Sequence, residues 1–346
     1  MGDGVGEVED VFGQAIVDLG RLTAAQPDRD PQALARRILA VCEGRGFGSS
    51  GALIGHLSEA LGSVGRTELR RATEAALASL PPASGEWRTE ERHRFLAYRL
   101  TILADLDKDT DAYIQAIRAG GMESTHGIDV AQRLIRAKSP AEALSWLDRP
   151  RRHTEYEDST EIDLTISALE ALGRKDEAQA HRWEFFERTL SVEHLRVYLK
   201  RLPDFEDFDA EQKAFVIAAA HKQAERALRF LIAWPALDRA DALVHRRIAG
   251  LDGRAYEALR PAAEALENKY PEAATLLYRR MVESVLDRGS STQYPYAARD
   301  LLSCGHLASR LPADVAIESH ATFVARLQKA HGRKYGFWGL INRKGP

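Results

Sequence analysis

The chain has 346 residues, of which 45% are hydrophobic, and a formal net charge of −3 at pH 7. This charge gives no electrostatic reason to expect nucleic acid or an anionic membrane as the partner. Two cysteines, Cys42 and Cys304, argue against a disulfide framework and cannot supply a cysteine-based zinc site. No apolar run approaches the roughly 20 residues of a membrane-spanning helix, and no signal segment precedes the first helix, so we predict a cytoplasmic protein.

The first 82 residues read as a small helical bundle. Asp30 and Pro31 form a helix entrance, with the aspartate as N-cap and the proline in the first turn. Pro81 and Pro82 prevent the last helix from continuing. The spacing of apolar residues predicts helices at about 7–22, 31–44, 51–62 and 68–80. We therefore predict an N-terminal domain at 1–82, followed by a linker at 81–87.

From residue 86 onward the predicted helices come in pairs. Residues 128–137 pair with 140–147, and 162–172 pair with 175–190. No stretch between 86 and 312 sustains the period-two alternation of a half-buried strand. The sequence therefore predicts an all-α protein, with a second domain at 86–346.

One phrase occurs twice near the end of the chain. Tyr270-Pro-Glu-Ala-Ala-Thr-Leu-Leu277 and Tyr294-Pro-Tyr-Ala-Ala-Arg-Asp-Leu301 both read Y-P-x-A-A-x-x-L. Proline suits the first turn of a helix, and Gly289 separates the two segments. The stretch 270–311 is therefore predicted to be a helical hairpin, the unit of α-solenoids. Chance recurrence in alanine-rich helices is the alternative.

Leu169-Glu-Ala-Leu-Gly-Arg-Lys-Asp-Glu-Ala178 resembles the turn of a tetratricopeptide repeat. Gly173 would take the left-handed conformation that ends one helix before the next begins. The full 34-residue repeat pattern is not sustained. The resemblance implies an α-solenoid of antiparallel, tetratricopeptide-like hairpins over 86–346, with an aromatic cap at its C-terminal end.

Much of the chain is similar to an uncharacterised all-helical family of α-proteobacteria that is known only as a domain of unknown function. The phrases that carry this resemblance are Ala168–Gln179, Tyr198–Phe205, Ala233–Arg239 and His331–Trp338, with a weaker echo at Arg37–Gly62. It implies a helical repeat fold and no known activity. Related helical regions follow SWIM zinc fingers in other proteins, but this chain lacks the cysteine-histidine cluster of such a finger, so no metal role carries over.

Two motif-like stretches fail the tests for a ligand site. Residues 46–51 match G-x-G-x-x-G but follow a predicted helix, whereas a dinucleotide site needs a preceding strand. Residues 105–111 alternate carboxylates but lack the glycine and glutamate of a calcium loop in either register, so Asp107 or Asp109 is predicted to cap a helix instead. We assign no catalytic, cofactor-binding or metal-binding residue. The sequence therefore favours a protein without enzyme activity, and an enzyme whose site is assembled from distant segments is a third interpretation that stays open.

Two charged stretches have both a structural and a functional interpretation. Residues 204–211 place five carboxylates around two phenylalanines, as an acidic first helical turn near Asp209 or as a rim for a basic partner. The tail after Glu318 carries six Lys or Arg residues with Tyr335, Phe337 and Trp338 among them. These aromatics could cap the last hairpin or stack on single-stranded nucleic acid.

The leading prediction is a non-catalytic helical-repeat scaffold that binds a protein or peptide in a groove, without membrane contact. The alternative is a nucleic-acid-associated protein that uses the tail and the loop Arg149-Pro-Arg-Arg-His153. The candidate partner-binding residues are Trp183, Phe186, Tyr198, Phe205, Asp207, Arg333, Lys334 and Trp338.

Overall fold

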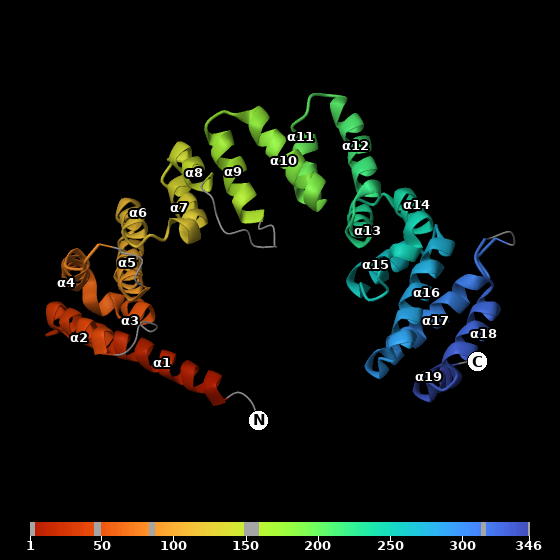
Figure 1. The fold of residues 1–346 in the computed structure, drawn as a ribbon, viewed down its shortest axis with the longest axis horizontal. Coiled ribbons are helices and arrows are strands. Elements are labelled where there is room, and N and C mark those ends of the chain that lie inside the picture. The colour runs from red at the N-terminus through yellow and green to blue at the C-terminus, as the bar shows by residue number, and fades with distance from the viewer. Residues whose placement is uncertain (1–3, 45–49, 83–86, 149–158, 313–315, 345–346) are drawn as a thin grey trace. The chain divides into compact units, whose positions relative to one another are not determined.

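The computed structural model describes residues 4–44, 50–82, 87–148, 159–312 and 316–344 (Figure 1). Every regular element in these ranges is a helix, and they contain no strand. The prediction of an all-α protein is therefore confirmed. The G-x-G-x-x-G stretch at 46–51 falls largely on residues 45–49, and the predicted linker falls largely on 83–86. Both ranges lie outside the described residues.

By internal contacts the chain divides into two compact units, residues 1–178 and 179–346. The first unit contains α1 (Gly4–Ala24), α2 (Pro31–Gly44), α3 (Ser50–His56), α4 (Ser58–Ala78), α5 (Trp87–Asp107), α6 (Thr110–Ala119), α7 (Glu123–Arg136), α8 (Pro140–Leu147) and α9 (Ser159–Ala171). Helix α10 (Lys175–Thr189) crosses the boundary, which falls after Ala178. The second unit contains α11 (Val192–Lys200), α12 (Glu206–Ala220), α13 (Ala224–Ala233), α14 (Leu237–Arg247), α15 (Tyr256–Leu266), α16 (Pro271–Arg288), α17 (Tyr294–Ala308), α18 (His320–His331) and α19 (Tyr335–Lys344).

Two apolar cores hold most of the first unit together. One joins α2, α3 and α4 to α5, which contributes Phe95, Leu96 and Leu103. The other joins α5 to α6, α7 and α8 around the fully buried Trp146. Helix α5 thus packs against helices that precede the predicted linker in the sequence and against helices that follow it. The domain division at 82–86 stays a prediction.

Several helix ends follow directly from the local sequence. The Asp30 carboxylate accepts N–H bonds from Gln32 and Ala33 at the start of α2, and the Asp109 carboxylate accepts one from Ala112 at the start of α6. Asp107 does not cap. Its two carboxylate oxygens instead lie 2.7 and 2.6 Å from arginine nitrogens on α4. The carboxylates of the calcium-like stretch are therefore used for capping and ion pairs.

Gly173 ends α9 in the left-handed region, with φ of +76°. The N–H of Arg174 donates to the carbonyl of Leu169, and the N–H of Gly173 donates to that of Glu170. This pair of bonds is the Schellman arrangement, in which a residue without a Cβ atom is favoured. The predicted left-handed turn at Gly173 is confirmed.

The predicted hairpin at 270–311 corresponds to α16 and α17, which pack against each other. Gly289 ends α16 with φ of +68°, and both helices carry their proline in the first turn. Ten residues of α16 are buried, because α14, α15, α17 and α18 also contact this helix. Helix α16 is therefore the central element of the second unit.

A buried ion pair ties α15 to α17 beside α16. The Arg260 guanidinium donates to both oxygens of Asp300, at 2.6 and 2.8 Å, and Asp300 is 1% exposed. Burial raises the pKa of Asp300, while the hydrogen bonds from Arg260 oppose that shift. The carboxylate thus depends on Arg260 to remain charged in the interior.

The sequence predicted an aromatic tail after the last helix, but residues 335–344 form a further helix, α19. Phe337 is fully buried and belongs to one core with residues of α16, α17 and α18, and Trp338 packs against the same core. The indole N–H of Trp338 donates to the carbonyl of His331 at 3.0 Å. As predicted, Trp338 packs on the last hairpin, but Phe337 is the more deeply buried residue.

The left-handed turn at Gly173 predicts that a Cβ atom added at this residue lowers the free energy of unfolding. Gly173→Ala should destabilise the first unit by about 1–2 kcal/mol, because L-residues are strained at this φ although space is open. Gly250→Ala is the matched control, since that site is equally open and has no positive φ. Urea unfolding that shows equal effects for the two variants would contradict the assignment.

The Arg260–Asp300 pair predicts that removing both charges costs less in the free energy of unfolding than removing the carboxylate alone. Asp300→Asn should cost about 3–5 kcal/mol in the free energy of unfolding, because it leaves the arginine buried without its carboxylate. The double variant Arg260→Met/Asp300→Leu should cost less than the single one, since both charges leave the interior. Chemical denaturation measures both. A double variant that loses as much stability as Asp300→Asn, or more, would show that the two charges do not depend on each other.

The packing of α19 predicts that loss of the ring has different effects on stability at two of its three aromatic positions. Phe337→Ala should lower the free energy of unfolding by about 3–5 kcal/mol, as for other fully buried phenylalanines. Tyr335→Ala should change it by less than about 0.5 kcal/mol, because Tyr335 is 79% exposed. Equal thermal shifts for the two variants would mean that α19 does not cap the core.

Candidate functional site

The buried residues of helix α12 are alanines. Ala210, Ala214 and Ala218 recur every four residues and are buried against neighbouring helices. This packing leaves Phe208, 64% exposed, and Val216, 68% exposed, away from the core. Two large apolar side chains of this helix are thus left in contact with solvent.

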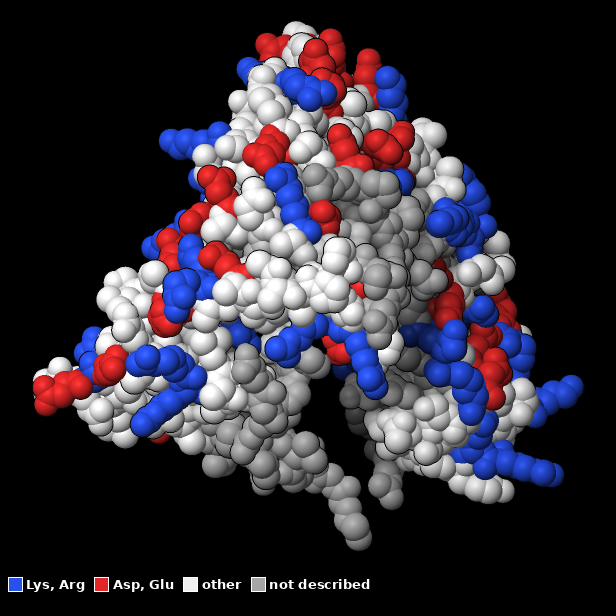
Figure 2. Space-filling view, turned by 60° about the vertical axis from the view of Figure 1, so that its left-hand side comes forward, with Lys and Arg blue, Asp and Glu red and all other residues white. Residues whose placement is uncertain are grey.

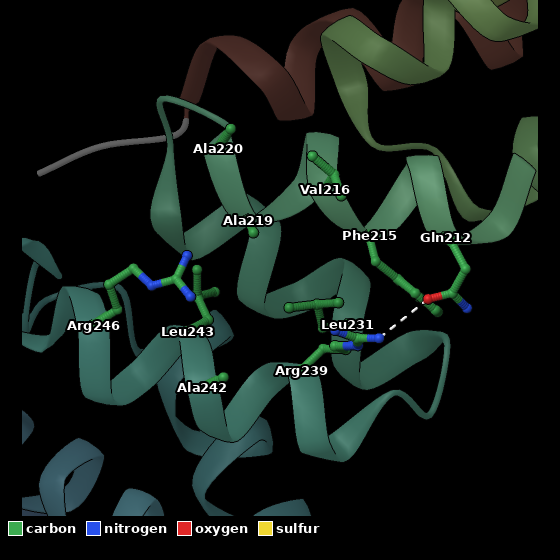
Figure 3. Close-up of a pocket in the computed structure, with 10 residues that line it drawn as sticks. All are labelled: Gln212, Phe215, Val216, Ala219, Ala220, Leu231, Arg239, Ala242, Leu243 and Arg246. Carbon is green, nitrogen blue, oxygen red and sulfur yellow. Dashed lines mark hydrogen bonds between the residues drawn. The ribbon is translucent and has the colours of Figure 1, made fainter. Parts of the chain in front are cut away.

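A groove lies between this face of α12 and helix α14, with one α13 residue in its lining, and has a volume of about 410 Å³ (Figure 3). Its lining is mostly apolar. The residues are Gln212, Phe215, Val216, Ala219 and Ala220 from α12, Leu231 from α13, and Arg239, Ala242, Leu243 and Arg246 from α14. The volume is in the range of sites that bind small molecules or peptide side chains.

Two arginines give the groove its charge. At one end the Arg239 Nη2 donates to the Gln212 side-chain oxygen at 3.1 Å, and at the other end lies Arg246 (Figure 3). Arg239 also lies 3.5 Å from Asp238, but both side chains of this pair are more than half exposed, so the contact stabilises little. Arg246 has no hydrogen bond or ion pair with any described residue. No lining residue carries a carboxylate, so the groove presents two positive charges over an apolar floor.

Three predicted site residues come together in the core of the second unit. Phe186 is fully buried, and the Trp183 ring lies 5.5 Å from it and 5.0 Å from the Tyr198 ring. The Trp183 indole N–H donates to Glu187, and burial raises the pKa of Tyr198. These aromatics hold α10 and α11 together and do not line the groove.

Phe205 and Asp207 lie at the start of α12. Phe205 is 91% exposed with φ of +73°, and the Asp207 carboxylate accepts the N–H of Phe208. Helix α12 begins at Glu206, so the acidic residues form its first turn, slightly earlier than the predicted start near Asp209. Both residues are on the groove's helix but not in its lining.

Arg333, Lys334 and Trp338 lie with the C-terminal helices. Arg333 and Lys334 line a separate hollow of about 550 Å³ beside Tyr294 and Tyr335. The structure therefore distributes the eight predicted residues over three places in the second unit. Sequence reasoning missed Val216, Arg239 and Arg246. The one available signal was the Phe208–Gln212–Val216 spacing, which runs beside the alanine stripe of α12.

Within the described ranges, no group of three or more His, Cys, Asp or Glu side chains is placed to hold a metal ion. Nor does any described helix combine the length and apolarity needed to cross a membrane.

Comparison with known proteins identifies one family. No curated protein and no solved structure matches the chain. One family model does, over residues 1–340, which is nearly the whole chain, and its description is a family of unknown function, DUF6880. The chain belongs to this family.

Proposed function

We propose that the protein is a non-catalytic helical-repeat scaffold that binds a peptide segment of another protein in the groove between α12 and α14. The observation that carries the proposal is the lining of that groove, an apolar floor with two arginines and no carboxylate. Such a surface is complementary to a segment that carries Asp or Glu beside an apolar side chain.

The order of helix contacts supports a repeat architecture. Within the second unit each helix from α11 to α17 contacts its successor in sequence. Several also contact the next but one, as α12 contacts α14 and α14 contacts α16. In solenoids each repeat contacts only its neighbours, and the surfaces between successive helices bind partners. We therefore keep the tetratricopeptide-like interpretation for this unit as part of the proposal.

The arginines are available to a ligand because their present contacts are weak. Arg239 donates to a neutral amide and meets a largely exposed carboxylate, and Arg246 has no described partner. A carboxylate between them would gain charge-assisted hydrogen bonds, while an apolar side chain beside it would cover Val216. Both parts of the ligand would thus be recognised.

The nucleic-acid alternative has less support. Of the three aromatics near the C-terminus, Phe337 is buried and Trp338 packs on the core, which leaves Tyr335 as the exposed ring for stacking. Positive and negative side chains lie among one another over much of the face in Figure 2, whereas nucleic-acid binding favours a continuous basic strip. The basic loop 149–153 lies outside the described residues.

The proposal is tested by selecting displayed random peptides on the full chain. We expect enrichment of sequences that pair Asp or Glu with Leu, Ile or Phe. Arg246→Glu should weaken binding of a selected peptide about tenfold or more, the effect of about 1.4 kcal/mol, because it replaces attraction by repulsion. Fluorescence anisotropy at low and high salt measures this loss.

The matched control is Arg229→Glu, which makes the same charge change on an exposed α13 residue outside the groove. It should leave the affinity unchanged. Equal effects of the two variants, or selection of peptides without acidic residues, would argue against the groove as the binding site. Loss of binding only after Arg333→Glu would instead favour the C-terminal surface.

A further inference from the structure

The hollow of about 550 Å³ in the second unit lies where helices α17 and α19 begin. Its walls are fixed by packing, because these two helices contact each other directly. The ring of the buried Phe337 lies 5.9 Å from the Tyr294 ring, and a Cβ atom on Gly336 would lie 3.7 Å from a carbon of the Tyr294 ring. The hollow is therefore bounded by two chain segments that the C-terminal core holds together.

Two cations line this hollow, and no lining residue carries a carboxylate. Arg333 is exposed and Lys334 is half-buried, so both charged groups belong to side chains that solvent reaches. Neither side chain forms a hydrogen bond or an ion pair with any residue that the structure describes. The Lys334 ammonium lies beside the end of α16, since its nitrogen would be 3.2 Å from a Cβ atom on Gly289. Carbonyls at a helix end attract a cation but do not neutralise it.

The backbone adds to this positive charge. The first two residues of α17 and the first two of α19 line the hollow. Each helix N-terminus carries a partial positive charge of about half an elementary charge. These partial charges supplement the full charges of Arg333 and Lys334. The hollow is thus a positively charged place in a chain whose formal net charge is −3.

Aromatic and apolar side chains form much of the remaining lining. Tyr335 is 79% exposed, so most of its ring is open to a flat group that stacks on it. Tyr294, Pro295 and Leu340 add further apolar surface, and Ser291 adds a hydroxyl group. The hollow therefore places cations next to a surface that suits an aromatic ring.

A small ligand fits these features better than a strand of nucleic acid does. A strand carries a phosphate at every nucleotide, so its binding depends on a continuous basic strip. The hollow offers two cations, enough for one phosphate group. Its volume is in the range of sites that bind small molecules.

We propose that this hollow binds a phosphate monoester joined to a flat aromatic ring, the chemistry of a small mononucleotide. Such a phosphate carries about two negative charges at pH 7, which Arg333 and Lys334 balance, whereas a carboxylate would leave one of them unbalanced. Arg333 offers the planar donor geometry that matches phosphate oxygens, and Lys334 offers a point charge. The aromatic ring stacks on Tyr335. The hollow shares no residue with the α12–α14 groove, so this site is independent of the proposed function.

Three probes separate the two parts of the ligand. They are adenosine monophosphate (AMP), adenosine, which lacks the phosphate, and inorganic phosphate, which lacks the ring. Each is titrated calorimetrically into the full chain. AMP should bind about tenfold or more tightly than either of the others, because it gains both charge-assisted hydrogen bonds and stacking.

Two variants in the lining should have different effects. Arg333→Gln should weaken binding of both AMP and inorganic phosphate by about 10–100-fold, the loss expected for hydrogen bonds to a charged group. Tyr335→Ala should weaken AMP binding by about tenfold and leave the affinity for inorganic phosphate unchanged, because it removes only the stacking surface. Both residues are exposed, so both variants should melt close to the wild-type temperature.

The matched control is Arg299→Gln, which removes the same charge from an exposed α17 residue outside the lining and should bind AMP normally. Several results would overturn the proposal. AMP binding no tighter than adenosine or inorganic phosphate would show that one part of the ligand is not recognised. Equal effects of Arg333→Gln and Arg299→Gln, unchanged AMP affinity in Tyr335→Ala, or no binding of AMP would equally exclude this site.

Discussion

The enclosure of α16 is the constraint on which the second unit depends. Because other helices contact this helix from several sides, its polar residues must find partners within the protein. Thr275 donates to a backbone carbonyl in its own helix, and the Tyr278 hydroxyl donates to Glu267. Arg260 and Asp300 satisfy one another on the helices that flank it. Arg279 is the exception on α16, since its Nε and Nη2 atoms are buried without a hydrogen-bond partner.

Helix α12 shows the opposite arrangement. It packs through three alanines, which lets its neighbours approach closely but covers little of its surface. Apolar residues on its other face therefore stay in contact with solvent, and the arginines of α14 stand beside them. The same unit thus contains a closed helix with one unmatched charge and an open helix with an unmatched apolar face. The proposed peptide groove arises from the second of these departures from complete packing.

Local features were predictable from sequence, and the assembled site was not. Asp30, Gly173 and the two prolines after Tyr270 and Tyr294 act within one helix turn, so their roles can be seen in the sequence. The predicted binding residues Trp183, Phe186 and Tyr198 pack against one another in the structure. The sequence could not show this, because α10 has aromatic and charged residues around its circumference and no clear inward face. Arg239 and Arg246 gain meaning only when α14 lies beside α12, and that juxtaposition depends on tertiary packing.

The most direct test of the central claim is methyl NMR of the full chain during titration with a selected acidic, apolar peptide. The account predicts chemical-shift changes at Val216, Ala219 and Ala242, which line the groove on its two facing helices. The methyls of Leu195 and Val285, buried in other parts of the same unit, should stay unchanged. Unchanged signals from the groove methyls, with chemical-shift changes at other methyls, would contradict the account.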